Sequence, residues 1–362
     1  MNSNLTNPRY NYLPQMKEYD DLGQDFVLYS MFTHKKNFSG NHINTDNYGF
    51  RFSKFNNKSI SVETELYSKE KINIIIGGST VFGVGASKDD KTIASCLSKI
   101  SNEKWINLGL RAGNSIQEYI NLIKIIGKTD NIGKIIVLSG INDVYMNLAF
   151  NNDSNNLDDF IFDNSRIQNF MNKNYLSHFS LKRKFVASII SFLKNIEINS
   201  IIDLRSMSDM LKFNKNRKRK VNSEKISSLD KLFSIFERNF LLYSSLEKGL
   251  KTTKVTFFLQ PYFNWIKKGS NQKEKEIMEY NNITYESSSL IHKKINRALY
   301  KKITKKLDGL SSKFNLKYHD LNVENLGGKD DFVFADSVHL TDIGNNKTSK
   351  IIAKYIYQKE SK

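Results

Sequence analysis

The chain has 362 residues, of which 39% are hydrophobic and 25% charged, and its formal net charge is +18. This length suffices to bury a core without disulfides, and the single cysteine, Cys96, excludes both a disulfide framework and a multi-cysteine metal site. Three prolines and 18 glycines exclude collagen-like and proline-rich disordered chains. The positive charge favours an anionic partner, such as nucleic acid, an anionic membrane surface or an acidic polymer.

The first 70 residues are polar and aromatic, and we expect them to form an extension (1–70) that packs on the core. They contain no apolar run typical of a secretory signal, and no stretch of about 18 apolar residues occurs anywhere in the chain. The nearest stretch, 185–204, is interrupted by charges and predicts an amphipathic helix that is packed or lies on a surface. We therefore expect a cytoplasmic protein without a transmembrane segment, for which peripheral membrane contact remains an alternative.

Short apolar runs alternate with segments of helical spacing through much of the chain. The runs are 72–76, 105–108, 135–138 and 255–259, and each is followed by glycine, serine or a Gln-Pro pair. Continuous apolar runs of this length are typical of parallel strands that are buried on both faces. The alternation therefore predicts an α/β fold with a central parallel sheet, formed by residues 71–145 and 250–362.

The alternation stops between the third and fourth runs. Residues 146–249 are rich in Asn, Ser and Lys, with apolar residues at helical spacing near 232–240. We interpret 146–249 as a mostly helical insertion or cap, in which the basic segment 212–220 forms a loop.

Candidate catalytic groups follow three of these strands, where ligands bind in open parallel sheets. Ser79 follows the first strand and can expose its hydroxyl there, although an ordinary helix N-cap explains it as well. Gly113 follows the second strand and, lacking a Cβ, can present its N–H to an oxyanion or form a simple turn. Asn142 follows the third strand and can donate its side-chain amide to the same oxyanion, or belong to a turn.

The fourth candidate lies near the C-terminus, in the segment 336–341. Asp336 precedes His339 by three residues, so its carboxylate can orient the imidazole within one loop. The imidazole then acts as a general base toward a serine. A lone histidine is more often a surface or core residue, but the serine, glycine, asparagine and Asp–His pair together favour one active site.

These four segments, in this order, resemble the sequence blocks of the SGNH hydrolases, the GDSL-type esterase superfamily. The resemblance covers about residues 70–145 and 250–357 and implies a three-layer sandwich, flavodoxin-like, around the parallel sheet. It implies Ser79 as the nucleophile, His339 as the base and Asp336 as the carboxylate that orients it. One residue departs from the family pattern, because Gly78 replaces the aspartate that usually precedes the serine. This variant resembles a subgroup that has Gly-Gly-Ser-Thr.

The resemblance also implies an oxyanion hole formed by the backbone amides of Ser79 and Gly113 and the side chain of Asn142. The upstream segment 42–51 resembles one that precedes the serine block in bacterial SGNH proteins, several of them linked to surface-polysaccharide modification. A strand and turn covering the sheet edge is the favoured interpretation of this segment. Arg51 remains a candidate for binding a substrate carboxylate or phosphate, and Arg111 is a second candidate substrate-binding residue.

A basic segment follows the fourth strand, with seven basic residues and no acid between positions 287 and 307. On a helical wheel its apolar residues form one stripe, and the basic residues lie largely opposite, as expected of a solvated face over a packed one. Contact with an anionic polysaccharide or a lipid head group is the alternative. Nucleic acid is not expected, because the chain contains no recognised binding motif.

The resemblance implies acyl-ester chemistry through an acyl-serine intermediate. We favour an esterase that acts on O-acyl, most simply O-acetyl, esters of a carbohydrate. An acetyl-CoA-dependent O-acetyltransferase modifying a capsular or lipopolysaccharide glycan is the main alternative, because it uses the same residues. A phospholipid esterase and a non-catalytic glycan-binding protein are further alternatives. No metal or cofactor is expected, apart from acetyl-CoA as the acyl donor of a transferase.

Overall fold

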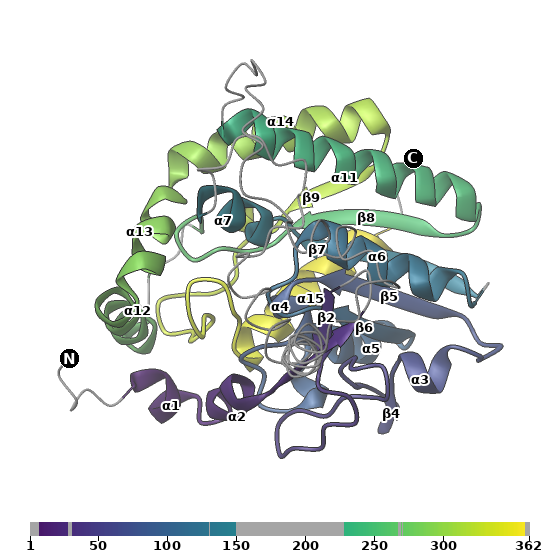
Figure 1. Cartoon of the computed structure of the whole chain (residues 1–362), viewed down its shortest axis with the longest axis horizontal. Helices are drawn as coiled ribbons and strands as arrows, with labels where there is room; N and C mark the ends of the chain where they lie inside the picture. Colours follow the sequence, from purple (N-terminus) through teal and green to yellow (C-terminus); the bar gives the residue numbers. More distant parts are fainter. Residues whose placement is uncertain are drawn as a thin grey trace, which may run out of the picture. The chain divides into compact units, whose positions relative to one another are not determined.

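A five-stranded parallel sheet forms the centre of the protein (Figure 1). The structure is a computed structural model, and it describes residues 7–27, 31–129, 131–149, 228–266, 269 and 271–358. In spatial order the strands are β6 (Lys104–Gly109), β5 (Ile72–Gly77), β7 (Ile132–Ser139), β8 (Lys254–Leu259) and β9 (Lys317–Asp320). The predicted α/β fold with a parallel sheet is therefore confirmed.

The strand order places a topological switch point beside β5. From β5 the chain first adds β6 on one side and then β7 on the other. In open α/β sheets of this order, ligands bind at the carboxyl ends of the strands where the direction reverses. The segments after β5 and β7 are those that contain Ser79 and Asn142.

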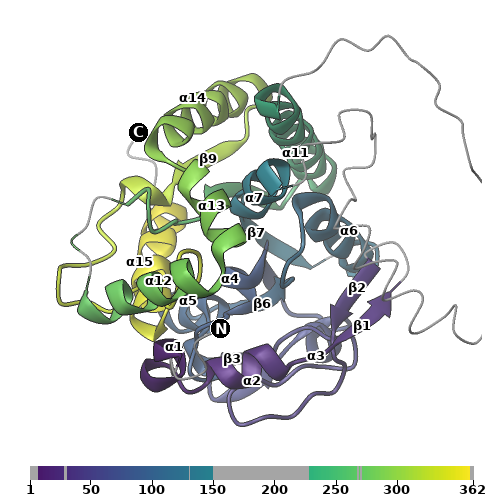
Figure 2. The same ribbon diagram turned by 60° about the vertical axis from the view of Figure 1, so that its left-hand side comes forward.

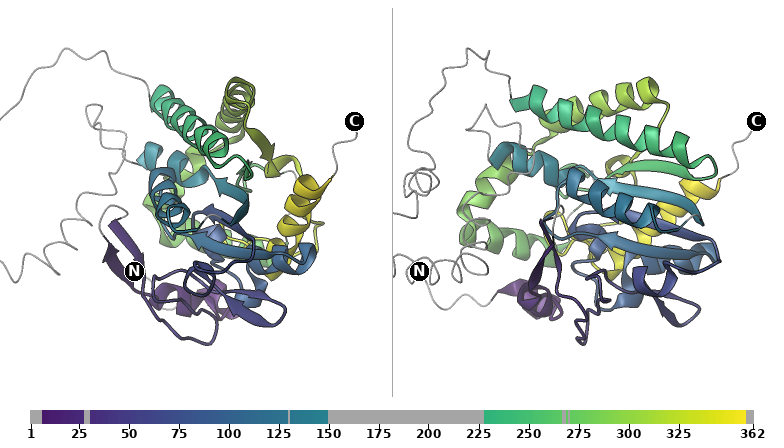
Figure 3. Two further views of the ribbon diagram at one scale, coloured as in Figure 1. Left: turned by 90° about the vertical axis from the view of Figure 1, so that its right-hand side faces the viewer. Right: turned by 45° about the vertical axis from the view of Figure 1, so that its right-hand side comes forward.

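Helices cover both faces of the sheet, because its strands alternate between two cores (Figure 3). Ile74 and Ile76 belong to one core and Ile75 to the other. The helices of the first face are α6 (Ser115–Ile126), α7 (Ile141–Ala149), α11 (Ser228–Leu250) and α14 (Arg297–Phe314). Those of the second are α5 (Ile93–Ser101) and α15 (Asp342–Tyr357). The layers agree with the three-layer sandwich that the resemblance implied.

The end of the predicted insertion differs from the structure. Leu232, Phe236 and Phe240 of α11 are buried in the first core, and α11 contacts β8 and α14. Residues from 228 onward therefore belong to the same compact unit as the sheet, although the sequence assigned residues up to 249 to the insertion. The apolar spacing was that of a helix packed on the sheet. The segments 185–204 and 212–220 lie outside the described residues.

The N-terminal segment packs against the chain just after the sheet's first strand (Figure 2). Its elements are α1 (Pro8–Tyr12), α2 (Met16–Asp21), β1 (Gln24–Val27), β2 (Met31–His34), β3 (Ser53–Phe55), β4 (Lys58–Ile60) and α3 (Val62–Glu65). Leu13, Met16 and Tyr19 share a small core with Phe82 and Val84. This extension therefore supports the loop that follows Ser79.

The remaining elements lie around the carboxyl ends of the strands. They are α4 (Ser79–Phe82), η1 (Asp89–Lys91), α12 (Gln272–Thr284), α13 (Glu286–Lys294) and η3 (Leu321–Val323). The basic segment 287–307, which the helical wheel represented as one helix, is divided between α13 and α14. Asn296 caps α14, because its side chain accepts the N–H groups of Ala298 and Leu299.

Candidate active site

Ser79 begins α4, immediately after β5 ends at Gly77. The side chain is partly exposed, whereas the neighbouring residues Gly78 and Thr80 are buried. Within the described residues, the backbone N–H of Ser79 makes no hydrogen bond. Both its hydroxyl and its backbone amide are thus available at the carboxyl end of the sheet.

A continuous hydrogen-bond chain joins Ser79, His339 and Asp336. The Ser79 hydroxyl donates to Nε2 of His339 over 2.7 Å, and Nδ1–H of His339 donates to Oδ2 of Asp336 over 2.6 Å. The other carboxylate oxygen of Asp336 accepts the backbone N–H groups of Val338 and His339. The structure therefore brings together the three residues that the sequence selected, in the order expected for a nucleophile, a base and an orienting carboxylate.

The environment of Asp336 keeps its carboxyl group ionised. Burial acts to raise its pKa, but the imidazole of His339, the charge of Arg9 and the backbone N–H of Val338 outweigh burial and hold the pKa well below its usual range. An ionised Asp336 fixes the proton of His339 on Nδ1, so Nε2 faces Ser79 as an acceptor.

Two residues that the sequence did not single out tie the serine to the histidine loop. The hydroxyl of Thr80 donates to the carbonyl oxygen of Val338 at 2.9 Å. Gln260, which follows β8, donates its side-chain amide to both Thr80 Oγ1 (2.7 Å) and the Val338 carbonyl (3.2 Å). No sequence signal marked these contacts, because each joins residues that are far apart in the chain.

Two of the expected oxyanion donors, Asn142 and Gly113, are in contact with each other, but both already donate hydrogen bonds within the chain. Asn142 donates one hydrogen of Nδ2 to the carbonyl oxygen of Gly113 at 2.7 Å. The second hydrogen of this amide can donate to an oxyanion. The N–H of Gly113 donates to the Leu110 carbonyl at 3.2 Å and closes a turn. For Gly113 to serve an oxyanion, its N–H must be shared between that carbonyl and the ligand.

Two glycines allow Asn142 to approach the serine. A Cβ on Gly78 would lie 2.6 Å from Nδ2 of Asn142, so a side chain there would displace the amide. Gly140 has φ of +110° where β7 turns into α7, a conformation that favours glycine. The glycine that replaces the family's usual aspartate is therefore in close approach to the candidate oxyanion donor.

A buried carboxylate anchors the segment that contains Asn142. Asp143 accepts the backbone N–H and the hydroxyl of Ser115 at 3.2 and 3.1 Å, which joins the start of α7 to the start of α6. Glu118 is buried nearby on α6, and burial together with the charge of Asp143 raises its pKa well above the usual value. The fourth residue of the Gly-Ile-Asn-Asp segment thus has a structural contact of its own.

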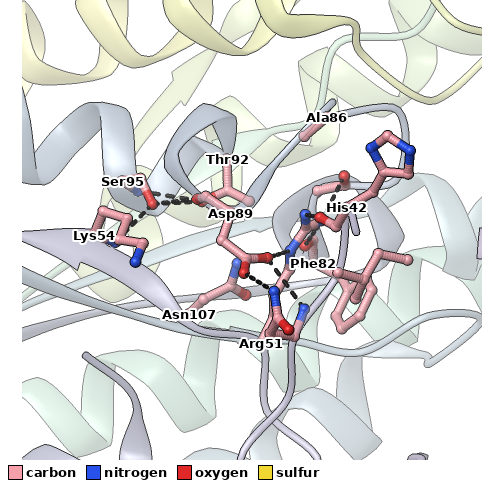
Figure 4. A network of polar contacts seen from close by, with 12 residues as sticks. His42, Arg51, Lys54, Phe82, Ala86, Asp89, Thr92, Ser95 and Asn107 are labelled. Carbon is pink, nitrogen blue, oxygen red and sulfur yellow. Dashed lines mark hydrogen bonds and ion pairs between the residues drawn. The ribbon is translucent and has the colours of Figure 1, made fainter. Parts of the chain in front are cut away.

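Arg51 does not face a substrate, which corrects the sequence-based hypothesis. Its side chain is fully buried, and its Nε pairs with Asp89 at 2.8 Å (Figure 4). The guanidinium also donates to the carbonyl groups of His42 (2.7 Å) and Gly83 (2.9 Å) and to the hydroxyl of Tyr19. Arg51 therefore fastens the N-terminal segment to the loop after Ser79.

Arg111 contacts the same N-terminal segment. Its backbone N–H donates to Nε2 of His34 at 3.1 Å, and its guanidinium donates to the Leu22 carbonyl at 3.3 Å. His34 is buried against Phe82, with the ring centroids 3.9 Å apart, and its Nδ1–H donates to the Gly49 carbonyl. These contacts hold the turn that contains Arg111 and Gly113 against the N-terminal segment. A role for Arg111 in substrate binding stays a prediction.

The described residues contain neither a membrane-spanning helix nor a metal-binding cluster. Across residues 7–149 and 228–358, with the gaps given above, no helix has the length and apolar character needed to span a membrane. The same part of the chain contains no group of three or more His, Cys, Asp or Glu residues arranged to hold a metal ion.

Comparisons with known proteins give structural neighbours only. No family model matches the chain, and a search of curated proteins finds no match. A solved acetyl xylan esterase is similar with a TM-score of 0.38 and 12% identity, over 79% of this chain and 100% of that one. A member of the lipolytic G-D-S-L family from Veillonella parvula has a TM-score of 0.37 and 10% identity, over 80% and 98% of the two chains. Its family is the one that the four sequence segments resemble. Because the scores and identities are low, we infer no substrate from these neighbours.

Proposed function

We propose that this protein is a serine esterase that hydrolyses O-acyl, most simply O-acetyl, esters of a carbohydrate through an acyl-serine intermediate. The observation that supports the proposal is the unbroken hydrogen-bond chain from Ser79 through His339 to Asp336. Such a chain removes the proton of a serine hydroxyl as the hydroxyl attacks, which is the requirement for nucleophilic catalysis by serine.

In the proposed first half-reaction, Oγ of Ser79 attacks the carbonyl carbon of the ester and its proton moves to Nε2 of His339. The carbonyl oxygen becomes an oxyanion, which accepts hydrogen bonds from the Ser79 amide and from the second hydrogen of Asn142 Nδ2. Collapse expels the alcohol, which takes the proton from His339 as its bond to the acyl carbon breaks. The acyl group remains on Ser79.

In the second half-reaction, water takes the place of the alcohol. His339 removes a proton from the water as it attacks the acyl-serine, and returns this proton to Oγ of Ser79 as the carboxylic acid leaves. Asp336 stays ionised throughout and stabilises the imidazolium that forms at each step. These steps use only the chain's own groups, so we propose that hydrolysis requires no metal or cofactor.

The O-acetyltransferase is a second candidate, because a sugar hydroxyl can replace water in the second half-reaction. Acetyl-CoA would then be the acyl donor, which would place the protein in the cytoplasm. A non-catalytic glycan-binding protein is a third candidate, but it has no need of the Ser79–His339 contact.

An anionic polysaccharide is the proposed natural substrate, because the net charge is +18 and Lys293, Lys301 and Lys305 are exposed.

The decisive experiment is intact-mass spectrometry of the protein after mixing and rapid quenching with acetyl-CoA or with an acetylated glycan. The proposed esterase gains one acetyl group from the glycan, and Ser79→Ala does not. Acetylation by acetyl-CoA, discharged on adding an unacetylated glycan, would assign the transferase instead. No Ser79-dependent adduct and no turnover with either donor would contradict both enzymes and favour the binding protein.

A further inference from the structure

A cavity of about 470 Å³ opens beside His339, a volume within the ~300–1,000 Å³ common for ligand sites. The loop Asp336–His339 forms one wall and residues of α12 and α13 form another. We call it the His292 cavity, after the α13 histidine that lines it. Neither Gly113 nor Asn142 is among its described lining residues, so it lies on the histidine side of the candidate site.

The contact with Tyr262 indicates which ring nitrogen of His292 carries the proton. The phenol of Tyr262 is buried, and burial raises its pKa, so it stays protonated. Its oxygen is 2.8 Å from Nδ1 of His292, and we assign the phenol as the donor and Nδ1 as the acceptor of this hydrogen bond. Burial lowers the pKa of His292, so the ring is neutral and its proton is on Nε2. Nε2 is 3.5 Å from Oγ of Ser337, at the limit of a hydrogen bond. This N–H is therefore left for an acceptor in the cavity.

The rest of the lining suits a polyhydroxylated ligand. Amide and hydroxyl side chains outnumber the aliphatic and phenylalanine side chains of the lining, at Asn264, Asn281, Asn282, Ser288 and Ser289, and one half-exposed aromatic ring, Tyr285, lies among them. A fatty acyl chain would remove these polar groups from water without offering them hydrogen bonds, which is costly. The hydroxyl groups of a sugar offer such bonds, and the C–H face of a sugar packs on an aromatic ring.

The proposed chemistry indicates which part of the substrate occupies the cavity. The leaving alcohol must take a proton from Nε2 of His339, so it must lie within hydrogen-bond reach of that atom. The cavity is lined by His339 and not by the oxyanion donors, so it adjoins the position of the alcohol rather than that of the carbonyl oxygen.

We propose that the His292 cavity binds the sugar ring that carries the ester, and that Nε2–H of His292 donates a hydrogen bond to an oxygen of this ring. The proposal rests on the esterase function above for the position of the alcohol. His292 is then a specificity residue, separate from the catalytic Ser79, His339 and Asp336.

The first test is binding without chemistry. Saturation-transfer NMR with the full-length protein would use methyl glycosides of a hexose, a uronic acid and an N-acetylhexosamine, none of which contains an O-acyl ester. We expect at least one to bind, and binding to weaken about 10-fold in His292→Phe, which keeps a ring against Tyr262 but loses the N–H donor. The matched control is His319→Phe, because His319 contacts Glu324 and Tyr355 and does not line the cavity. If His292→Phe fails to fold, Tyr285→Ala at the exposed rim should weaken binding instead.

The second test compares kcat/KM for the O-acetylated form of the bound glycoside with kcat/KM for 4-nitrophenyl acetate. The ratio of the two should fall about 10-fold in His292→Phe and stay constant in His319→Phe.

Failure of all the glycosides to bind, with 4-nitrophenyl acetate still hydrolysed, would overturn the cavity proposal and leave the esterase proposal intact. A rate that rises with acyl-chain length, and loses this rise in His292→Phe, would assign the cavity to the acyl group and also overturn it. Failure of the esterase proposal itself has a different signature: sugar binding sensitive to His292→Phe, without Ser79-dependent hydrolysis.

Discussion

Thr80 and Val338 are 258 positions apart in the sequence, and a hydrogen bond of 2.9 Å joins the hydroxyl of the first to the carbonyl of the second. Each is the immediate neighbour of a candidate catalytic residue, Ser79 in one case and His339 in the other. The bond therefore sets how far the histidine loop stands from the serine, and Gln260 reinforces it by donating to both partners.

We expect Thr80→Val, which keeps the side-chain shape but removes the hydroxyl, to lower kcat for 4-nitrophenyl acetate about 10-fold with little change in KM. The reason is that a small displacement of His339 from Ser79 weakens proton transfer without altering substrate binding. Thr80→Ser restores the hydroxyl and should recover most of the activity. An unchanged kcat in Thr80→Val, or a loss seen only in KM, would contradict this positioning role.

Ser79→Ala and His339→Ala should each abolish hydrolysis of the same aryl acetate. The two side chains act as a unit, because one supplies the nucleophile and the other accepts its proton, so the double variant should be no less active than either single one. Steady-state kinetics of the three variants, with circular dichroism to verify folding, provides the measurement. Substantial activity in either folded single variant would exclude the mechanism.

Asn142→Ala should lower kcat by about 10²–10³ with little change in KM, because the amide stabilises charge that develops only in the transition state. Asn142→Asp is a companion variant that keeps the size of the side chain, but both variants remove the N–H that binds the carbonyl of Gly113 as well as the N–H for the oxyanion. A matched rise in KM at constant kcat would show that Asn142 binds the substrate in its ground state instead.

The proposed anionic substrate predicts a difference in salt dependence between two substrates. Activity on an acetylated anionic polysaccharide should fall steeply as salt rises, since charge attraction is screened beyond about 8 Å at physiological ionic strength. Activity on a neutral aryl acetate should hardly change. Replacing Arg217, Lys218, Arg219 and Lys220 with serine should flatten the first dependence and leave the second as it is. Identical salt profiles for the two substrates would remove the support for an anionic glycan.

Buried His34 predicts a pH-dependent stability. Burial, with the nearby charge of Arg111, lowers its pKa from 6.5 to about 3. Between these values the unfolded chain binds a proton that the folded protein excludes, so the free energy of unfolding should fall as pH drops from 6.5 toward 3. This group contributes about 1.4 kcal/mol per pH unit. Urea unfolding between about pH 4.5 and 6.5 measures the slope, which should be shallower in His34→Gln. An equal slope in the variant would mean that His34 does not titrate in this way.

The parts of this protein that the sequence determined are those whose physical cause is local. The apolar run 72–76, followed by glycines, is typical of a buried strand, and a parallel sheet places the residues after such strands at one edge. Asp336 and His339 are close enough in the chain to meet within a loop. The candidate catalytic set therefore followed from short segments and their order.

Only the tertiary structure decided the contacts between distant segments. Arg51 looked available to a substrate until Asp89, Tyr19 and the loop after Ser79 proved to surround it. Likewise, no spacing in the sequence links Thr80 to Val338, or Tyr262 to His292. A side chain's partner across the fold depends on how whole elements pack, and the free energy of that packing is spread over the many apolar contacts that bring the elements together. Short segments of the sequence thus indicated the candidate catalytic residues, and packing determined which other residues support, position or surround them.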